Sequence, residues 1–373
     1  RDLSLLVPVD QRGHGGLPVA LRQVVLEGEI ILKTRTPNVR GAGIAGTGSA
    51  VPERVLTNFD LEKMVDTSDE WIVERTGIKE RRIADEGMVT SDLAKEAALK
   101  ALDDAGMTAD QLDLIIVATI TPDTIFPSCA CAVQGKINAT NAAAFDISAG
   151  CTGFVYALSV ARDLVSSGRY DNILVIGAEI LSKIVNWHDR NTCVLFGDGA
   201  GAAIVRPCAL DQGIVECVLR SDGSRGDVLV LPAGGSRMPA SHKTVESELH
   251  YIQMKGNLVY RFAVNVMVEA AVEVLNKANL KEDDIDFVIP HQANQRLIDL
   301  AAERLGTSDK IYSNIARLGN TSAASIPIAL DEAARLGKLK SGDMVLLVGF
   351  GAGLTWGSAI LKWCKDGFAN DTV

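Results

Sequence analysis

Residues 96–116 read EAALKALDDAGMTADQLDLII, and residues 269–289 read EAAVEVLNKANLKEDDIDFVI. The two stretches align at a constant offset and without a gap. Each begins with apolar residues at helical spacing and ends in a short apolar run that is typical of a strand. Chance similarity explains the match less well than duplication, because the turn between helix and strand keeps its length. We infer that the chain contains one α/β half-domain twice, at a period too long for a solenoid repeat.

The segments that follow each copy extend the duplication loosely and divide the chain into two halves. In both halves continuous apolar strands alternate with helices, which favours buried, mostly parallel sheets covered by helices. We place the N-terminal half at residues 41–212 and the C-terminal half at residues 213–364. A polar stretch rich in Gly and Pro, residues 221–250, is expected on the surface. We interpret residues 1–40 as an extension of unknown role, without the apolar core of a secretory signal, and residues 365–373 as a tail.

Composition and charge argue against several classes of protein. The chain has 373 residues, a formal net charge of -10 and a pI of about 5.1, whereas a surface that binds nucleic acid is basic. The longest apolar runs, such as residues 114–120, are too short to span a membrane. The seven cysteines include no CxxC pair and the histidines no HExxH pair. We therefore expect free thiols in a reducing compartment and no metal site.

The stretch DISAGCTGF at residues 146–154 carries the first candidate catalytic residue. It follows an apolar run and precedes a helix-like segment, which places Cys151 where a helix begins. Unpaired N–H groups and the helix dipole favour the thiolate there, and each unit by which the pKa falls gives nearly tenfold more nucleophile. The same stretch also fits a buried structural cysteine, because cysteine packs as a small hydrophobic residue.

Two further polar residues lie near predicted strand ends in the second half. His291 comes directly after the strand at residues 286–290, and Asn320 lies in a Gly-Asn-Thr turn. Taken singly, such residues most often serve packing or the turn itself. Their joint placement at positions that correspond to that of Cys151 indicates a shared site. A glycine loop at residues 349–353 leaves backbone N–H groups approachable, as an oxyanion hole requires.

Four motifs together resemble those of one family. They are AGCTG at residues 149–153, PHQAN at 290–294, GNTS at 319–322 and GFGAGLTWG at 349–357. This set looks like β-ketoacyl-acyl carrier protein synthase III, the priming condensing enzyme of type II fatty acid synthesis, and the likeness runs from about residue 41 to residue 363. The resemblance implies the thiolase fold, with two duplicated α/β halves in α-β-α-β-α layers, and a homodimer.

The resemblance also implies a two-step condensation that needs no cofactor. The thiolate of Cys151 would take the acyl group from an acyl-CoA, with acetyl-CoA as the default starter. Backbone N–H groups of Cys151 and of the loop at Gly351 and Ala352 would hold the oxyanion. Malonyl-acyl carrier protein would then bind with its thioester carbonyl held by His291 and Asn320, lose CO2 and attack the acyl-cysteine. A thiol that serves as nucleophile and leaving group, and neutral donors facing developing charge, suit this chemistry independently of the family.

Contacts with CoA and with the acyl chain follow from the same resemblance. Trp71 would stack on the adenine with Arg190 on the other side; the family usually has Gly after this Arg, where this chain has Asn191. Four residues would line the pantetheine tunnel, namely Arg75, Gly256, Ala293 and Asn294. The acyl pocket would be shaped by Leu181 and, across a dimer interface, by Phe126. Taken alone, Trp71 also fits a packing residue at a helix start, and Phe126 fits ordinary loop packing.

Docking of the carrier protein requires local positive charge, because carrier proteins and this chain are both acidic. Arg296 and Arg304 follow His291 on one predicted helix, and Arg261 is close in sequence to Gly256. We expect these three arginines to bind the carrier protein. Each of them alone also fits a solvated charged face.

Neighbouring families differ at the same positions. Elongating synthases pair the cysteine with two histidines, and biosynthetic thiolases carry a second cysteine in the last glycine loop. Chalcone-synthase-like enzymes share Cys, His and Asn, but usually have Pro where this chain has Ala352. The alternatives are therefore a chalcone-synthase-like or secondary-metabolite condensing enzyme with another starter, and a non-catalytic thiolase-fold subunit that binds a carrier protein. We expect a bacterial cytoplasmic protein, with a plastid as the alternative.

Overall fold

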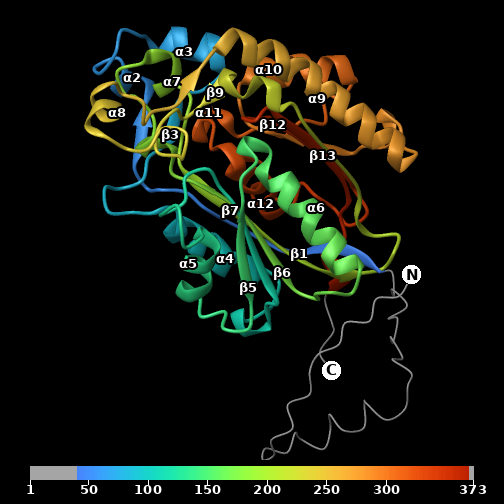
Figure 1. The fold of residues 1–373 in the computed structure, drawn as a ribbon. Coiled ribbons are helices and arrows are strands. Elements are labelled where there is room, and N and C mark those ends of the chain that lie inside the picture. The colour runs from blue at the N-terminus through green and yellow to red at the C-terminus, as the bar shows by residue number, and fades with distance from the viewer. Residues whose placement is uncertain (1–39, 369–373) are drawn as a thin grey trace, which may run out of the picture. The chain divides into compact units, whose positions relative to one another are not determined.

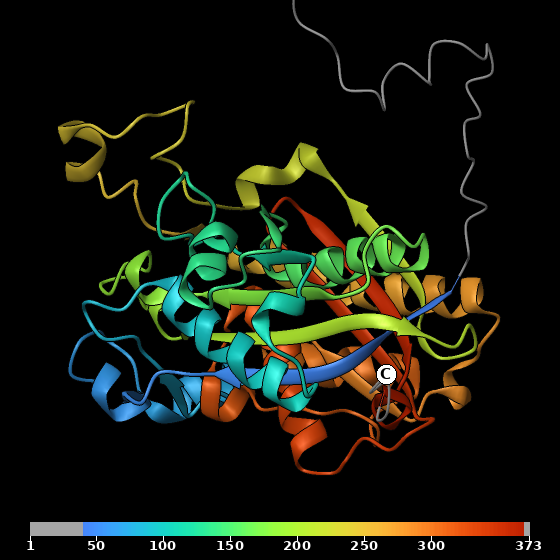
Figure 2. The same ribbon diagram turned by 90° about the horizontal axis from the view of Figure 1, so that it is seen from below.

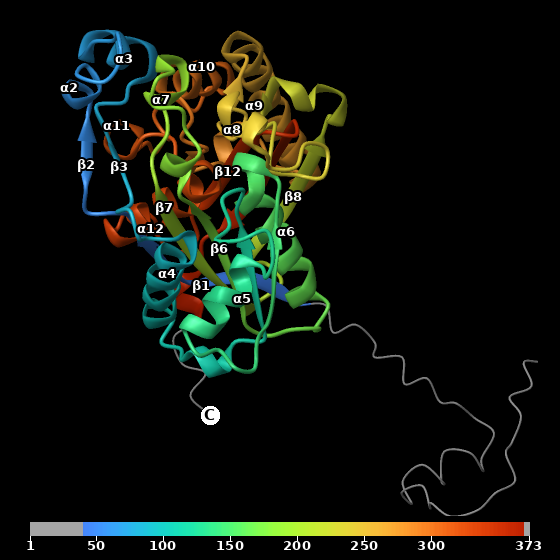
Figure 3. The ribbon, with the colours of Figure 1, turned by 60° about the vertical axis from the view of Figure 1, so that its left-hand side comes forward.

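The computed structural model describes residues 40–368. Nearly all of the predicted extension and the last part of the predicted tail lie outside the described residues. Within the described chain, two stacked β-sheets have helices between them and on both outer faces, which gives five layers (Figures 1 and 3). This arrangement confirms the predicted fold of two α/β halves in α-β-α-β-α layers.

The five-stranded sheet belongs to the first half of the chain. Its strand order is β1-β7-β6-β4-β5, with the bounds β1 Gly41–Ala50, β4 Leu114–Ala118, β5 Ala143–Ile147, β6 Ile173–Glu179 and β7 Gly199–Cys208. Helices α4 (Thr90–Asp104) and α5 (Cys129–Lys136) cover its outer face. Strand β5 is left at the edge of this sheet.

The four-stranded sheet belongs to the second half. Its strand order is β11-β12-β13-β8, with the bounds β8 Gly213–Ser221, β11 Phe287–Pro290, β12 Met344–Gly351 and β13 Thr355–Lys362. Helices α9 (Gly256–Ala278) and α10 (Gln295–Leu305) cover its outer face and lie along the top of Figure 1. The chain changes sheet between Cys208 and Gly213, while the exact domain bounds stay a prediction.

Helices α6 (Gly153–Ser166) and α12 (Ser325–Arg335) form the middle layer. Their apolar side chains share one core with those of both sheets, and Phe154 of α6 is fully buried in it. Each of the two helices follows a single 3-10 turn, Gly150–Thr152 before α6 and Ser322–Ala324 before α12. The middle layer therefore brings two equivalent turns to the same side of the molecule, one from each half.

The duplication is visible in matched elements outside the middle layer as well. Strands β4 and β11 begin at residues that correspond in the sequence repeat. The short 3-10 turns before them, Ala109–Gln111 and Glu282–Asp284, also fall at the same offset. The gapless alignment of the two stretches therefore reflects two copies of one structural unit.

The prediction of mostly parallel sheets was wrong. Strand β4 runs parallel to β5 and β6, and β11 runs parallel to β12. The pairs β1–β7, β6–β7, β12–β13 and β13–β8 are antiparallel. Helices cover both faces, so a strand of either direction reads as a continuous apolar run. On β4, for example, Ile115 packs toward the outer helices and Ile116 toward the middle layer.

Shorter elements cap one end of the sheets. They are β2 (Val55–Thr57), α2 (Asn58–Leu61), α3 (Asp69–Thr76), β3 (Glu80–Arg82), α7 (Arg190–Cys193), β9 (Leu229–Val230), α8 (His242–Glu246), β10 (Gln253–Met254) and α11 (Ile315–Leu318). The predicted surface stretch at residues 221–250 contains β9 and α8, and Figure 2 shows α8 projecting away from the sheets. Across residues 40–368, no helix has the length and apolar character needed to cross a membrane.

Candidate active site

Cys151 lies in the 3-10 turn between β5 and α6, against the end of β12. Its side chain is buried. Gly150 adopts a φ of 54°, and a Cβ atom there would lie 2.7 Å from the backbone nitrogen of Ala352. A Cβ atom on Gly351 would lie 2.4 Å from the backbone nitrogen of Cys151. The two backbone segments can approach this closely because both positions lack a side chain, as the predicted oxyanion hole requires.

Threonine hydroxyls fasten this turn to the glycine loop. The Thr355 hydroxyl lies 2.8 Å from the carbonyl oxygen of Ala149 and 3.0 Å from that of Ala352, and can donate to either. It also lies 3.2 Å from the hydroxyl of Thr152. The contact with Ala149 joins positions 206 residues apart. Thr152 and Thr355, which both lie within the quoted motifs, therefore hold the nucleophile turn and the glycine loop together.

His291 follows β11, and its ring is fully buried. The ring atom Nδ1 lies 2.7 Å from the hydroxyl oxygen of Ser325, which also accepts the backbone N–H of Gln292 at 3.3 Å. We assign the serine proton to the bond with Nδ1 and the ring proton to Nε2, the tautomer in which Nε2 can donate into the cavity. Nε2 has no hydrogen-bond partner among the described residues. Burial lowers the pKa of His291 to about 3, so the imidazole is neutral at physiological pH.

Asn320 is held by its backbone and by its side-chain oxygen. Its N–H donates to the carbonyl of Leu195, and its own carbonyl accepts from Gly197. The side-chain oxygen accepts the backbone N–H of Ser322 at 2.8 Å. The side-chain amide nitrogen is thereby left as the donor that Asn320 can offer to a ligand. Its position is set by the first half of the chain as well as by its own turn.

These three residues meet in one cavity. Cys151, His291 and Asn320 line a space of about 110 Å³ together with Phe350 and Gly351. The ring of Phe350 meets that of His291 edge-on, with centroids 5.4 Å apart. Among residues 40–368, no group of three or more His, Cys, Asp or Glu side chains is placed to hold a metal ion.

The predicted direction of the pKa shift at Cys151 was wrong. The helix start suggested a lowered pKa, but burial raises the pKa of Cys151 to about 12, and the nearby carboxylate of Glu179 acts in the same direction. A hydrogen bond with Ser322 opposes the rise without cancelling it. The free enzyme therefore holds a thiol rather than a thiolate, and the thiol must lose its proton as it attacks.

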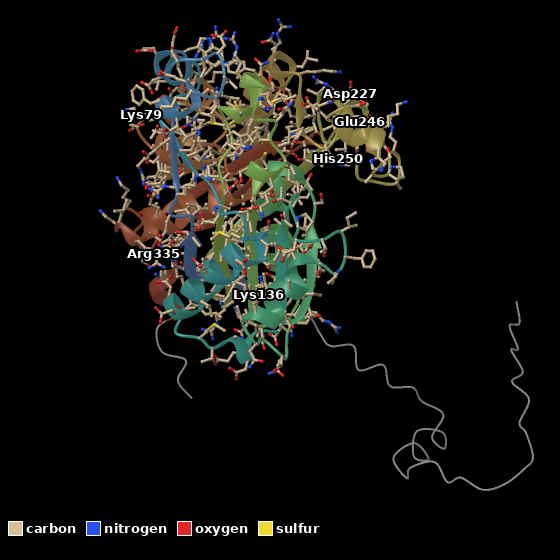
Figure 4. All side chains as sticks on the ribbon, turned by 90° about the vertical axis from the view of Figure 1, so that its left-hand side faces the viewer. Lys79, Lys136, Asp227, Glu246, His250 and Arg335 are labelled. Atoms are coloured by element: carbon tan, nitrogen blue, oxygen red, sulfur yellow. The ribbon has the colours of Figure 1, made fainter. Side chains whose placement is uncertain are left out.

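A second cavity of about 310 Å³ is also lined by Cys151. Its lining is mostly apolar and includes Leu181 and Ala352. Further apolar side chains come from Ile120, Ile184, Leu229, Leu231 and Ile252. The stretch at residues 221–250, taken from the sequence as a surface excursion, thus also supplies part of this wall. Figure 4 shows its outer part, where Glu246 and His250 are labelled, standing clear of the sheets.

A third cavity of about 350 Å³ leads toward the first and contains several predicted CoA contacts. Trp71, Arg75, Gly256 and Asn294 line it, and the last two also line the first cavity together with Ala293. The side-chain amide of Asn294 donates to the carbonyl of Arg75 at 2.8 Å. The residues predicted for the pantetheine tunnel therefore lie along one path to Cys151.

Two guanidinium groups contact the ring of Trp71. The Cζ atom of Arg75 lies 4.7 Å from the ring centroid, and that of Arg190 lies 5.2 Å from it. An adenine between Trp71 and Arg190 requires these side chains to move apart, because two stacking contacts of about 3.5 Å each exceed that separation. Asn191, which replaces the family's usual Gly, sits in the helical turn α7 capped by Asp189 and needs no left-handed conformation.

The remaining predicted residues lie outside these cavities. Phe126 is 84% exposed, as is its neighbour Ile125, and it lines none of the cavities described above. Arg261 lies on α9, and Arg296 and Arg304 lie on α10, which packs against α9. All three arginines are exposed, and no ion pair joins any of them to another described residue.

Sequence reasoning missed three polar residues around the site. Ser325 orients His291, Ser322 contacts Cys151 and holds Asn320, and Glu179 accepts a hydrogen bond from Ser322. Ser322 is the last residue of the quoted GNTS motif, so its place in that motif could have indicated a role in the site. Glu179 ends a buried apolar strand, where a charged residue is uncommon, and that pattern in the sequence could have indicated it.

Comparison with known proteins places this geometry in a family. Residues 145–223 match 3-oxoacyl-(acyl-carrier-protein) synthase III, and residues 275–363 match its C-terminal part. The β-ketoacyl-(acyl-carrier-protein) synthase III of Caldanaerobacter subterraneus subsp. tengcongensis is 62% identical over 325 residues, which cover 87% of this chain and 98% of that protein. The chain belongs to this family. Its motifs at Cys151, His291 and Asn320 are thus those of a β-ketoacyl-acyl carrier protein synthase III.

Solved structures agree with this membership. The 3-oxoacyl-(acyl-carrier-protein) synthase III of Aquifex aeolicus VF5 is 49% identical, with a TM-score of 0.80 over 87% of this chain and 100% of that one. A priming β-ketosynthase from the R1128 polyketide biosynthetic pathway is 36% identical, with a TM-score of 0.82 over 89% of this chain and 99% of that one. The chain is thus similar in structure to a protein of a polyketide biosynthetic pathway as well.

Proposed function

We propose that this chain uses Cys151, His291 and Asn320 to perform the reaction of the β-ketoacyl-acyl carrier protein synthase III family. The enzyme is an acyltransferase that condenses an acyl-CoA with malonyl-acyl carrier protein, releases CO2 and CoA, and so starts fatty acid synthesis. The observation that carries the assignment of residues is the single cavity that Cys151, His291 and Asn320 line beside Gly351.

The first half-reaction is the acylation of Cys151. The sulfur attacks the thioester carbonyl of acyl-CoA, and the bond between that carbonyl carbon and the CoA sulfur breaks. Backbone N–H groups of Cys151 and Gly351 hold the carbonyl oxygen as its charge develops, a contribution of about 3 kcal/mol for each well-placed donor. The acyl chain then occupies the apolar cavity that Leu181 lines.

The second half-reaction needs donors that are neutral and already in place. Malonyl-acyl carrier protein presents its thioester carbonyl to Nε2 of His291 and to the amide nitrogen of Asn320. Because burial keeps His291 neutral, Nε2 can donate without first gaining a proton. Loss of CO2 leaves an enolate-like carbanion that both donors stabilise. The carbanion attacks the acyl-cysteine and releases the sulfur of Cys151.

The reaction is tested with a panel of acyl-CoA starters. The full-length protein is incubated with malonyl-acyl carrier protein and acetyl-, branched or longer acyl-CoA, and the release of CO2 and the formation of 3-oxoacyl-acyl carrier protein are measured. We expect product with acetyl-CoA. Product with other starters alone would favour a role in secondary metabolism or in branched-chain synthesis, and absence of product with every starter would contradict the proposed function.

We propose that the carrier protein docks on α9 and α10 beside the tunnel entrance. Arg261 and Arg296 are exposed there and unpaired with other described residues, and Arg304 lies further along α10. Gly256 and Asn294, at the starts of these helices, line the entrance cavity. An acidic carrier protein bound to these arginines would place its prosthetic arm over that cavity.

Reversing the charges of Arg261 and Arg296 tests docking of the carrier protein separately from acylation of Cys151. In the double variant Arg261→Glu and Arg296→Glu we expect the KM for malonyl-acyl carrier protein to rise roughly tenfold, because exposed ion pairs contribute about 0.2–1 kcal/mol each. Acylation of Cys151 by acetyl-CoA should be unchanged. Arg169→Glu, an exposed arginine after α6, is the control. An unchanged KM in the double variant, or an equal rise in the control, would exclude this docking surface.

We propose that the enzyme is a homodimer joined along β5. This strand is the edge of the five-stranded sheet, and its residue Phe145 is 39% exposed. An exposed apolar edge strand is a template for pairing with another chain. Ile125 and Phe126 add two apolar side chains that are each 84% exposed. A second copy of this chain would cover these residues and, as the family resemblance implies, receive Phe126 at its acyl pocket.

A lysine on the edge strand tests the dimer. In Phe145→Lys we expect a shift from dimer to monomer in sedimentation velocity, because lysine on an edge opposes strand pairing. Val272→Lys changes an apolar residue of α9 that is 37% exposed and should leave the mass unchanged. A wild-type protein that sediments as a monomer, or a dimer that persists in Phe145→Lys, would count against pairing through β5.

Two further parts of the proposal concern cofactors and location. We propose that the reaction needs no cofactor, because Cys151, His291 and Asn320 supply the nucleophile and the donors that it requires. A cytoplasmic location in a bacterium is supported by the bacterial origin of the relatives described above. The polyketide relative leaves a different starter as the second candidate, and the starter panel decides between them.

A further inference from the structure

Cys151 needs a proton acceptor that the residues named so far do not supply. The sulfur carries a proton at neutral pH, because burial raises its pKa. His291 is not available as a base, since burial lowers its pKa to about 3. Ser322 lies beside Cys151 in the lining of the second cavity, and its hydroxyl acts on the pKa of the thiol.

Behind Ser322 lies the carboxylate of Glu179, at the end of β6. Its side chain is fully buried. The Ser322 hydroxyl donates to Oε1 at 3.1 Å. The hydroxyls of Thr119 and Thr121 donate to Oε2 at 3.2 and 2.5 Å, and the N–H of Ile120 lies 3.2 Å from Oε2. The carboxylate is thus saturated with donors on one side and connected to the active-site turn on the other.

A purely structural role leaves one feature of Glu179 and one of Ser322 unexplained. No ion pair joins its carboxylate to a cation among residues 40–368, and a buried charge without a counter-charge is costly. Ser322 comes from the other half of the chain, 143 residues away, and has a φ of 51°, a conformation that residues other than glycine adopt uncommonly. Unusual burial and backbone conformation beside a nucleophile point to a functional connection.

We propose that Glu179 accepts the proton of Cys151 through Ser322 when the sulfur is acylated, and returns it when condensation releases the sulfur. This inference rests on the proposed role of Cys151 as the nucleophile. Glu179 is a positioning residue in this scheme, because it contacts Ser322 and not the substrate. The acyl-enzyme is then the state in which the proton resides on Glu179.

The transfer balances in both half-reactions. In acylation a bond forms between Sγ of Cys151 and the acyl carbon, the bond to the CoA sulfur breaks, and CoA leaves as a thiolate that takes a proton from solvent. The Cys151 proton moves to Oγ of Ser322, whose own proton moves to Oε1 of Glu179. In condensation the carbanion displaces Sγ, and both protons move back along the same path. No oxidant or other reactant is needed.

The surroundings of Glu179 allow it to exchange a proton near neutral pH. Burial raises the pKa of Glu179 to about 7, although the hydrogen bonds from its donors oppose the rise. Strand β7 presents Gly199 opposite it, and residues 119–121 present no titratable side chain. Other titratable groups close by are the Cys151 thiol and the Cys129 thiol of α5. Asp123, Asp146 and Lys136 also act on Cys129.

The test follows acylation and decarboxylation separately in the full-length protein. Single-turnover acylation by acetyl-CoA is followed by intact mass from pH 5.5 to 8.5, and decarboxylation of malonyl-acyl carrier protein by release of CO2. In the wild type the acylation rate should rise with pH as the acceptor ionises, with an inflection near pH 7. In Glu179→Gln we expect acylation about 100-fold slower without that inflection, a typical contribution of proton transfer. Decarboxylation should persist, because His291 and Asn320 are intact.

Two further variants guard against a merely structural effect. Ser322→Ala keeps the backbone N–H that holds Asn320 but breaks the proton path, and should slow acylation as Glu179→Gln does. Asp331→Asn neutralises another buried carboxylate, which accepts the hydroxyls of Thr47 and Ser49, and should leave the pH profile unchanged. Wild-type acylation and an unchanged inflection in Glu179→Gln would overturn the inference, as would equal losses of acylation and decarboxylation. A wild-type protein that forms no acyl adduct would instead overturn the proposed function.

Discussion

Cys151→Ala will form no acyl adduct with acetyl-CoA, and condensation will fall by about 10⁴-fold or more, because the covalent intermediate cannot form. The wild-type protein will gain the mass of one acetyl group. The variant removes one sulfur from a cavity that His291 and Asn320 continue to line. Decarboxylation of malonyl-acyl carrier protein should therefore continue in the variant. Intact-mass spectrometry and a CO2-release assay measure the two outcomes on the same sample.

The remaining six cysteines provide an internal control for this result. Cys129, Cys193 and Cys364 are also buried, whereas Cys131 is exposed. Cys131→Ala, which removes the exposed thiol of α5, should acylate as the wild type does. An acetyl adduct that persists in Cys151→Ala, or that disappears in Cys131→Ala, would show that the nucleophile is not Cys151.

Asn320→Asp will lower the rate of condensation by about 100-fold or more, the usual cost of losing one donor to a developing oxyanion. The substitution preserves shape: one carboxylate oxygen can still accept the N–H of Ser322, as the amide oxygen does at 2.8 Å. The other oxygen then faces the cavity where the amide nitrogen donated, and brings negative charge toward a carbonyl that itself becomes negative. Steady-state kinetics with malonyl-acyl carrier protein measure the loss.

The half-reaction that slows in Asn320→Asp distinguishes a donor role for Asn320 from a structural one. Acylation of Cys151 in Asn320→Asp should change much less than decarboxylation, because the acyl oxygen is held by the backbone at Cys151 and Gly351. Asn314→Asp alters another buried asparagine, one that donates to Glu332 rather than to the cavity, and should leave decarboxylation largely intact. Equal losses in both half-reactions of Asn320→Asp would argue that Asn320 shapes the turn and does not act as a donor.

The catalytic cavity could be predicted because its residues sit in short motifs that follow strands. The repeat identified two copies of one unit. His291 follows β11, the counterpart of β4, whereas Cys151 follows β5, which pairs in parallel with β4. Sheet direction could not be predicted in the same way, because a strand with helices on both faces is apolar in either direction. The direction in which the pKa of Cys151 moves also depends on burial depth, which a helix start in the sequence does not reveal.

Contacts between residues of the two halves could not be predicted from the sequence. Ser322 and Glu179 are 143 residues apart, and no local pattern joins them. The contact of Arg190 with Trp71 likewise depends on the placement of α7 against α3. The family resemblance supplied roles for several entrance residues, but the distances that decide whether an adenine fits came from the fold.

The close approach of the Cys151 turn and the glycine loop has a consequence for the protein during its synthesis. The thiol of Cys151 leaves the ribosome long before the loop that ends at Thr355, and the contact of Thr355 with Ala149 spans 206 residues. Contacts between such distant positions form late, because the entropy of closing the long loop must be overcome first. A nascent or truncated chain thus carries Cys151 without the glycine loop, and the cysteine becomes reactive toward thioesters once the second half has docked.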